Sequence, residues 1–200
     1  TPGGLGFNPE WRKAAGKQYI DVGIAEEHAI AMSSGIAKNG GKPVFNVYST
    51  FLQRTYDQLV QDLCVNNNSA VIMIHQASVY GMNDITHLGF FDIPMLTSIP
   101  NLVYLAPTNN EELLAMTEYA VHQHEHPVAI RVPVGEFTST GVADTTDYSL
   151  LNKSEVTRRG ERIALLGLGN FYHLANQVAD ELAKLGINAT VVNPKFASGL

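Results

Sequence analysis

The sequence predicts an α/β protein: a mostly parallel sheet with helices on both faces, followed by a partial second α/β unit. Short apolar stretches alternate with amphipathic ones along residues 1–135, which is the pattern of successive β-α-β connections. Residues 70–74 (AVIMI) are continuously apolar, as expected for a strand that is buried on both faces. A polar stretch covers residues 136–156 and is predicted to be a linker between the two units.

The strands of the first unit are short apolar or β-branched runs between helical patterns. Each run is followed by a polar or Gly-containing stretch, where a strand ends and a connection begins. The predicted strands are 19–22, 43–48, 70–74, 102–106 and 128–132.

The helices of the first unit carry start or stop signals. The helix predicted at 26–38 ends at an Asn-Gly-Gly sequence, and the one at 51–65 ends at three successive asparagines. The helix at 107–122 begins where Thr108 or Asn109 can cap it, and two glutamates follow, which suits the positive end of the helix dipole.

The second unit, 157–200, is predicted to be one strand, one helix and one strand. Its strands are 162–167 and 189–192, and its helix includes 176–184. One such unit cannot bury both faces of a sheet, so we expect it to be the opening of a longer domain. The sequence Gly-Leu-Gly-Asn at 167–170 lacks the third glycine of a dinucleotide fingerprint, because Tyr172 stands there. A tight strand-to-helix turn is the better interpretation.

Composition excludes several classes of function. The chain has 13 basic and 19 acidic residues and no basic stripe, which argues against binding to nucleic acid or to an anionic membrane surface. No apolar run approaches the roughly 20 residues of a membrane span. Cys64 is the single cysteine and is predicted to be a buried apolar residue in a protein of a reducing compartment, the cytoplasm. We expect no metal site within this chain.

Chemically useful side chains follow the ends of neighbouring predicted strands. Glu26 follows the first strand, Tyr48, Phe51 and Arg54 follow the second, and His87 lies in the loop after the third. Singly, each has a structural explanation: a helix-dipole partner, core aromatic residues, a surface ion pair and a loop residue. Because the carboxyl ends of parallel strands meet at one edge of a sheet, we expect the five side chains to converge. Together they can bind the ring of a heteroaromatic cofactor.

Specific runs within this pattern resemble 1-deoxy-D-xylulose-5-phosphate synthase. They are DVGIAEEH at 21–28, YSTFLQRTYDQ at 48–58, the Thr-His-x-Gly sequence at 86–89, and the segments 99–101 and 106–108. The resemblance is close over 19–133 and weaker to the end. It implies that 1–135 is the pyrimidine-binding domain of a transketolase-like enzyme that uses thiamine diphosphate. It also implies that 157–200 begins the C-terminal domain, and that an upstream domain holds the diphosphate and Mg²⁺.

The resemblance also assigns roles to the five side chains. Glu26 would hydrogen-bond a ring nitrogen of the aminopyrimidine and thereby activate the cofactor. Phe51 would pack on the pyrimidine ring, and Tyr48 and Arg54 would line the same pocket. His87 would face the substrate as a proton donor or an orienting group. The implied reaction decarboxylates pyruvate and joins the two-carbon unit to glyceraldehyde 3-phosphate.

The chain departs from this family on the acceptor side of the site. Gln76 and Val134 stand where the family has arginines, and Asn83 stands where it has aspartate. In the family those arginines hold the phosphate of the acceptor. The resemblance also makes Tyr48 a substrate-binding residue that lines the pocket. Glutamine and valine cannot reproduce a bidentate arginine–phosphate contact. We therefore expect weak binding of the triose phosphate or a different acceptor.

Other interpretations stay open at this point. The nearest alternatives are a transketolase, a split transketolase subunit, and a paralogue that uses another acceptor. A non-catalytic binding module that keeps the fold is the alternative from a different class. The expected partners are the upstream domain of the same protein, a second copy in a homodimer, and small-molecule substrates. Alone, the piece is expected to be inactive.

Overall fold

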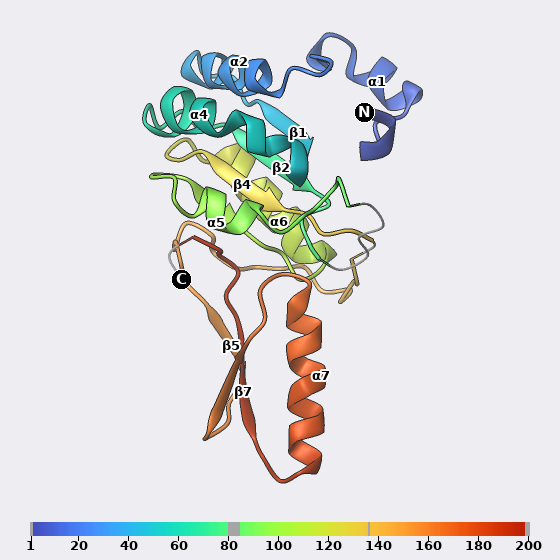
Figure 1. The fold of residues 1–200 in the computed structure, drawn as a ribbon, viewed down its shortest axis with the longest axis vertical. Coiled ribbons are helices and arrows are strands. Elements are labelled where there is room, and N and C mark those ends of the chain that lie inside the picture. Colours follow the sequence, from blue (N-terminus) through green and yellow to red (C-terminus); the bar gives the residue numbers. More distant parts are fainter. Residues whose placement is uncertain (1, 80–84, 136, 199–200) are drawn as a thin grey trace.

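The computed structural model describes residues 2–79, 85–135 and 137–198 (Figure 1). The first unit contains short 3₁₀ segments at η1 (Pro2–Leu5), η2 (Gly16–Gln18) and η3 (Gln53–Thr55). Its helices are α1 (Pro9–Ala15), α2 (Glu26–Lys38), α3 (Ser49–Leu52), α4 (Tyr56–Gln58), the π-helical η4 (Leu59–Cys64), α5 (Asp92–Leu96) and α6 (Asn110–His122). Its strands are β1 (Val44–Tyr48), β2 (Val71–His75), β3 (Val103–Leu105) and β4 (Val128–Arg131).

The main sheet confirms the predicted α/β class. Its strand order is β1-β2-β4-β3 and every pair is parallel, with Val71 opposite both Val44 and Val128. Parallel strands require crossover connections, and the helices supply them on both faces. All carboxyl ends of the strands therefore lie along one edge, as a convergent site requires.

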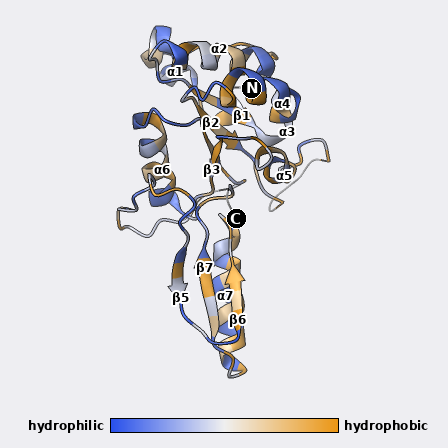
Figure 2. Cartoon of the chain, turned by 90° about the vertical axis from the view of Figure 1, so that its left-hand side faces the viewer, coloured by the Kyte–Doolittle hydropathy of each residue, from blue (hydrophilic) through white to orange (hydrophobic). Residues whose placement is uncertain are grey.

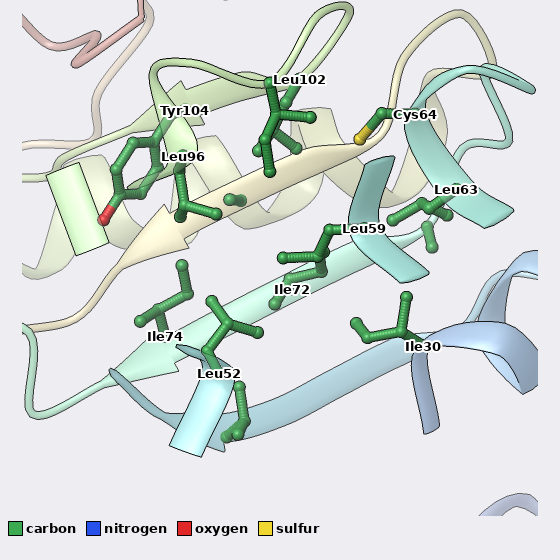
Figure 3. Close-up of a cluster of buried hydrophobic side chains, with 14 of the residues drawn as sticks. Ile30, Leu52, Leu59, Leu63, Cys64, Ile72, Ile74, Leu96, Leu102 and Tyr104 are labelled. Atoms are coloured by element: carbon green, nitrogen blue, oxygen red, sulfur yellow. The ribbon is translucent and has the colours of Figure 1, made fainter. Parts of the chain in front are cut away.

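Each face of the main sheet has its own apolar core. Alternate residues of β2 separate the two: Ile72 and Ile74 pack beneath α2 to α5, whereas Val71 faces α6. Figure 3 shows the first core, in which Ile30 of α2 and Leu52 of α3 lie against these strands. Burial on both faces explains why these strands are apolar runs without alternation.

The strand predicted at 19–22 does not form. Tyr19 packs on the N-terminal segment instead, with its ring centroid 6.0 Å from that of Trp11 and 6.4 Å from that of Phe7. Asp21 then accepts a hydrogen bond from the amide of Gly23 at 3.0 Å, a turn that competes with an extended backbone. Local aromatic packing and this turn overcome the β-branched pattern of the segment.

The predicted helix at 51–65 is a chain of short helical segments, α3, η3, α4 and η4. The hydroxyl of Thr55 donates to the carbonyl of Leu52 at 2.7 Å where the helix is interrupted. The buried residues Leu52, Leu59 and Leu63 still share one face. The helical prediction is confirmed in outline, and Cys64, at its end, is fully buried as predicted.

The second unit contains the predicted strand, helix and strand plus one additional strand (Figure 2). β6 (Ile163–Leu166), α7 (Phe171–Lys184) and β7 (Ala189–Asn193) form the predicted β-α-β unit, with β6 and β7 parallel. β5 (Glu155–Arg158) pairs antiparallel with β7. It was missed because its residues are polar or exposed, so the predicted linker ends inside a strand.

The segment after β7 joins the second unit to the first. Lys195 accepts a backbone hydrogen bond from Ala106 at 2.8 Å, and Ala197 donates one to Tyr104 at 2.7 Å. This extension covers the outer edge of β3, which would otherwise be unpaired. Asn170, just before α7, donates to Ser78 beyond the end of β2 at 3.1 Å. The start of α7 thus lies beside the edge that carries the candidate site.

The turn before α7 is tight, as predicted. A Cβ on Gly167 would lie 2.5 Å from Cα of Tyr172, so only glycine permits this approach.

Among the described residues, none of the helices has both the length and the apolar character needed to cross a bilayer.

Candidate functional site

The candidate site lies at the carboxyl ends of β1 and β2. Tyr48 is the last residue of β1, and α3 begins at the next residue. Phe51 and Arg54 therefore lie within two turns of the strand end. The connection from β1 to α3 has no loop, which fixes these side chains relative to the sheet.

Glu26 opens α2 and is paired with Arg54. Nη1 of Arg54 lies 3.1 Å from Oε2 of Glu26. The Glu26 side chain is 12% exposed, whereas that of Arg54 is 44% exposed. The carboxyl group is therefore largely buried, whereas the guanidinium is partly exposed to solvent. Glu26 and Arg54 come together as predicted, but the strand that was expected to place Glu26 does not form.

Tyr48, Phe51 and His87 form an aromatic cluster. The rings of Tyr48 and Phe51 are stacked, with centroids 5.9 Å apart and an interplanar angle of 29°. The imidazole of His87 meets both edge-on, 5.3 Å from Phe51 and 6.3 Å from Tyr48. All three side chains are half-buried. They present flat apolar surface, which suits a planar heteroaromatic ring.

The loop that carries His87 is attached to α3. The hydroxyl of Thr50 donates to the carbonyl of Thr86 at 3.2 Å. The hydroxyl of Thr86 lies 2.9 Å from Nδ1 of His87, so it restrains the imidazole at one nitrogen.

The predicted acceptor-side residues lie at the ends of β2 and β4. Gln76 directly follows β2 and has a left-handed backbone with φ of 55°. The amide of Ala77 bonds to the carbonyl of Val132 at 3.0 Å, which brings the chain near Gln76 beside the chain near Val134. Asn83 lies outside the described residues. Gln76 and Val134 bring an amide and an isopropyl group to this part of the site, and neither side chain carries a charge.

Comparison with known proteins decides the family. The family description "Transketolase, pyrimidine binding domain" matches residues 5–139, and "Transketolase, C-terminal domain" matches residues 152–200. The chain belongs to the transketolase family.

Within this family, the chain is similar to enzymes named 1-deoxy-D-xylulose-5-phosphate synthase. It is 41% identical to that of Acaryochloris marina over 92% of this chain and 29% of the relative. It is 42% identical to that of Gloeothece citriformis over the same shares, and 40% identical to that of Desulforudis audaxviator over 98% and 31%. The chain thus spans about a third of the length of these relatives.

Solved transketolase structures share the fold. A "Split gene transketolase, inactive beta4 tetramer" matches with a TM-score of 0.76 and 21% identity, over 95% of this chain and 61% of that one. A transketolase mutant from Pichia stipitis, in complex with fructose-6-phosphate, matches with a TM-score of 0.79 and 18% identity, over 95% and 29%. At this identity the comparison concerns the fold alone.

The side chains present fit the aminopyrimidine ring of thiamine diphosphate. That ring has polar nitrogens on its rim and an apolar face. Glu26 offers a carboxyl group for the ring nitrogens, and the stacked pair of Tyr48 and Phe51 offers an aromatic surface for the ring face. Among the described residues there is no cluster of His, Cys, Asp or Glu side chains that could hold a metal ion.

Two buried polar clusters of this transketolase-family chain were not predicted from the sequence. Arg131 pairs with Asp92 beneath the His87 loop, and Lys195 pairs with Glu112 between the two units. A signal existed for the first: Arg131 stands in an otherwise apolar predicted strand, and a buried guanidinium needs a partner. Its partner could not be read from the sequence, because Asp92 lies 39 residues away.

Proposed function

We propose that this chain supplies the pyrimidine half of a thiamine diphosphate site in a transferase. The observation that carries the proposal is the placement of Glu26 at the start of α2, paired with Arg54, which follows Tyr48 and Phe51 of the stacked aromatic pair along the same connection after β1. Bound there, thiamine diphosphate supplies the carbanion chemistry that amino acid side chains cannot provide. The Mg²⁺ and the diphosphate are assigned to an upstream domain of the full-length protein.

Each side chain then has a defined task toward the ring. The carboxyl group of Glu26 would hydrogen-bond a ring nitrogen and share a proton with it. Phe51 packs on the ring face and, with Tyr48, excludes water from it. Arg54 orients Glu26 through the contact of 3.1 Å. His87, edge-on to Phe51, faces the substrate as a proton donor or an orienting group.

The reaction we propose is that of 1-deoxy-D-xylulose-5-phosphate synthase, the name of the relatives at about 40% identity. Pyruvate is decarboxylated and its two-carbon unit is joined to glyceraldehyde 3-phosphate. The product is a precursor of isoprenoids and of the thiamine and pyridoxal cofactors. We place the enzyme in the cytoplasm, consistent with its free and buried cysteine. We also propose that it is a homodimer.

The uncharged acceptor side favours a second candidate within the same chemistry. Gln76 and Val134 cannot form charge-assisted bonds to a phosphate. For Asn83, which lies outside the described residues, a role in acceptor binding rests on the sequence alone. A transketolase-type enzyme with an unphosphorylated acceptor is therefore the alternative. A non-catalytic binding module is a weaker alternative, because a scaffold has no use for the paired and half-buried Glu26.

Carbon dioxide release from pyruvate by the full-length protein separates these candidates. Release that depends on thiamine diphosphate and is strongly stimulated by glyceraldehyde 3-phosphate is the expected result for the synthase. Release without stimulation indicates another acceptor. No release, together with no turnover of ketose donors, would contradict an enzymatic role.

A further inference from the structure

A buried polar cluster lies directly beneath the loop that carries His87. Nε of Arg131, at the end of β4, donates to Oδ2 of Asp92 at 2.7 Å. The hydroxyl of Tyr104 donates to the same oxygen. Asp92 and Tyr104 are fully buried and Arg131 is 6% exposed. We call these three residues the Arg131 cluster.

The three side chains meet because the sheet register brings them to one face. Tyr104 on β3 lies opposite Ala129 on β4, two residues before Arg131. Both side chains point toward α5, whose first residue is Asp92. Figure 3 shows Tyr104 beside Leu96 of α5, with its hydroxyl at the edge of the apolar cluster. Burial raises the pKa of this hydroxyl, and the negative charge of Asp92 raises it further, so it remains a donor.

Arg131 also holds the loop itself. Its Nη2 donates to the carbonyl of Gly89 at 3.0 Å. On the other side, Gly89 lies against the chain that leaves β2: a Cβ there would be 1.8 Å from the carbonyl oxygen of Gln76. Gly89 is therefore fixed between Arg131 and the segment at 76–78, two residues after His87.

The other end of this short segment is held as well. Thr86 accepts the hydrogen bond from Thr50 at 3.2 Å, and the His87 ring lies 5.3 Å from that of Phe51. Residues 86–89 are thus held by α3 at one end and by Arg131 and the segment 76–78 at the other. A histidine between two fixed points keeps its ring position, whereas a histidine with one attachment pivots about it.

We propose that Arg131 and Asp92 are positioning residues that fix His87 toward the reacting substrate. The inference rests on the proposed function for the task of His87, but the placement itself rests on geometry. A buried ion pair adds little net stability compared with an apolar pair of the same shape, because both charges lose their hydration. Its directional bonds define where α5 and Gly89 lie relative to β4. The second oxygen of Asp92 has no hydrogen-bond partner among the described residues, so Arg131 is its main electrostatic compensation.

The first arm of the test is a double-mutant cycle in the full-length enzyme. Arg131→Lys keeps the charge and removes the forked geometry. We expect kcat for carbon dioxide release with the triose phosphate to fall roughly 10- to 100-fold, as for a misplaced catalytic group, with KM for pyruvate unchanged. In a His87→Gln background, the same change should cause no further loss, because it acts through His87. An equal loss in both backgrounds would overturn the proposal.

The second arm needs no activity and therefore separates this proposal from the proposed function. Histidines of the full-length protein are labelled with ¹³C at Cε1, and His87 is assigned by its absence in His87→Gln. We expect its resonance to shift in Arg131→Lys as the ring moves relative to Phe51. An unchanged resonance overturns the proposal, whether or not the protein releases carbon dioxide.

Two further variants keep the result interpretable. Tyr104→Phe removes one hydroxyl from the cluster and keeps the core, so it serves if Arg131→Lys fails to fold; we expect the same shift with smaller amplitude. Arg158→Lys alters an exposed ion pair with Asp180, 2.8 Å long, in the second unit. It should leave both kcat and the His87 resonance unchanged, and a shift there equal to that of Arg131→Lys would contradict a specific role for Arg131.

Discussion

At the scale of single residues, the site depends on contacts between side chains that are distant in sequence. Glu26 and Arg54 are 28 residues apart and form one ion pair. Their convergence was predicted from the sequence, because each follows the end of a predicted strand. It could not predict the distances, which depend on how α2 and α3 pack on the sheet.

Cys64 gives a prediction that follows from burial alone. Its side chain is fully buried, and burial raises the pKa of the thiol from 9.0 to about 12. The thiol therefore stays protonated in the folded protein at pH 8. Incubation with iodoacetamide at this pH, followed by mass spectrometry, should show no alkylation until the protein is unfolded with urea.

The pH dependence of this group has a definite sign. Because the folded protein binds the proton more tightly, Cys64 stabilises the fold fully below pH 9, and this contribution is lost as the pH rises toward 12. Complete alkylation of the folded protein at pH 8 would show that the thiol is accessible.

At the scale of elements, packing decides where the sequence pattern alone is ambiguous. The segment 19–22 has the composition of a strand, yet Tyr19 packs on α1 and Asp21 forms a local turn. The strands 71–75 and 128–131 were predicted correctly because burial on both faces leaves an apolar run. β5 was missed because the residues of an exposed edge strand carry no such pattern.

Gly89 provides a test of the close approach between the His87 loop and β2. Gly89→Ala places a Cβ 1.8 Å from the carbonyl oxygen of Gln76, so the loop must move. We expect the free energy of unfolding to fall by about 1–3 kcal/mol, as for other overpacked sites. Urea denaturation monitored by circular dichroism measures the change.

Gly35→Ala is the matched control for this substitution. Gly35 lies inside α2, and a Cβ there would meet no atom within 4 Å. Alanine should therefore stabilise the protein by about 0.5–1 kcal/mol through its higher helix propensity. If both substitutions change stability in the same direction and to the same extent, the close approach at Gly89 has no energetic consequence.

At the scale of the whole molecule, one buried ion pair joins the two units. Nζ of Lys195 lies 2.8 Å from Oε1 of Glu112, which also accepts a hydrogen bond from Asn193 at 2.7 Å. Lys195 is 4% exposed and Glu112 is 5% exposed. The pair fixes the segment after β7 against α6, and so helps to place α7 beside the site. Nothing in the sequence signalled this pair, because a lysine in a Pro-Lys-Phe turn is ordinarily exposed.

Removal of the Lys195 ammonium should therefore destabilise the fold strongly. Lys195→Met leaves the carboxylate of Glu112 buried without its cation, which costs about 3–5 kcal/mol. Lys184→Met removes a surface pair with Glu181, in which both side chains are exposed, and should change stability by less than about 0.5 kcal/mol. Chemical denaturation of the two variants at pH 7 makes the comparison, and equal effects would contradict a structural role for the buried pair.

The same pair predicts a loss of stability at alkaline pH. Burial disfavours the charged ammonium, but the hydrogen bond and charge of Glu112, with smaller contributions from Glu155 and Asp144, outweigh it and raise the pKa of Lys195 above 10.5. Its contribution is therefore complete below pH 10.5 and is lost as the pH rises through the higher pKa of the folded state. A wild-type protein whose alkaline unfolding matches that of Lys195→Met would show that this linkage is absent.

Glu26, we propose, activates thiamine diphosphate at the carboxyl edge of the main sheet. The most direct measurement is the rate at which the thiazolium C2 proton of the bound cofactor exchanges with deuterium in the full-length protein. We expect Glu26→Gln to slow this exchange by roughly 100-fold or more, in the range of general acid–base catalysis. The adjacent and exposed Glu27 supplies the control, and Glu27→Gln should leave the rate unchanged. Equal exchange rates in wild type and Glu26→Gln, with the cofactor bound in both, would contradict the account.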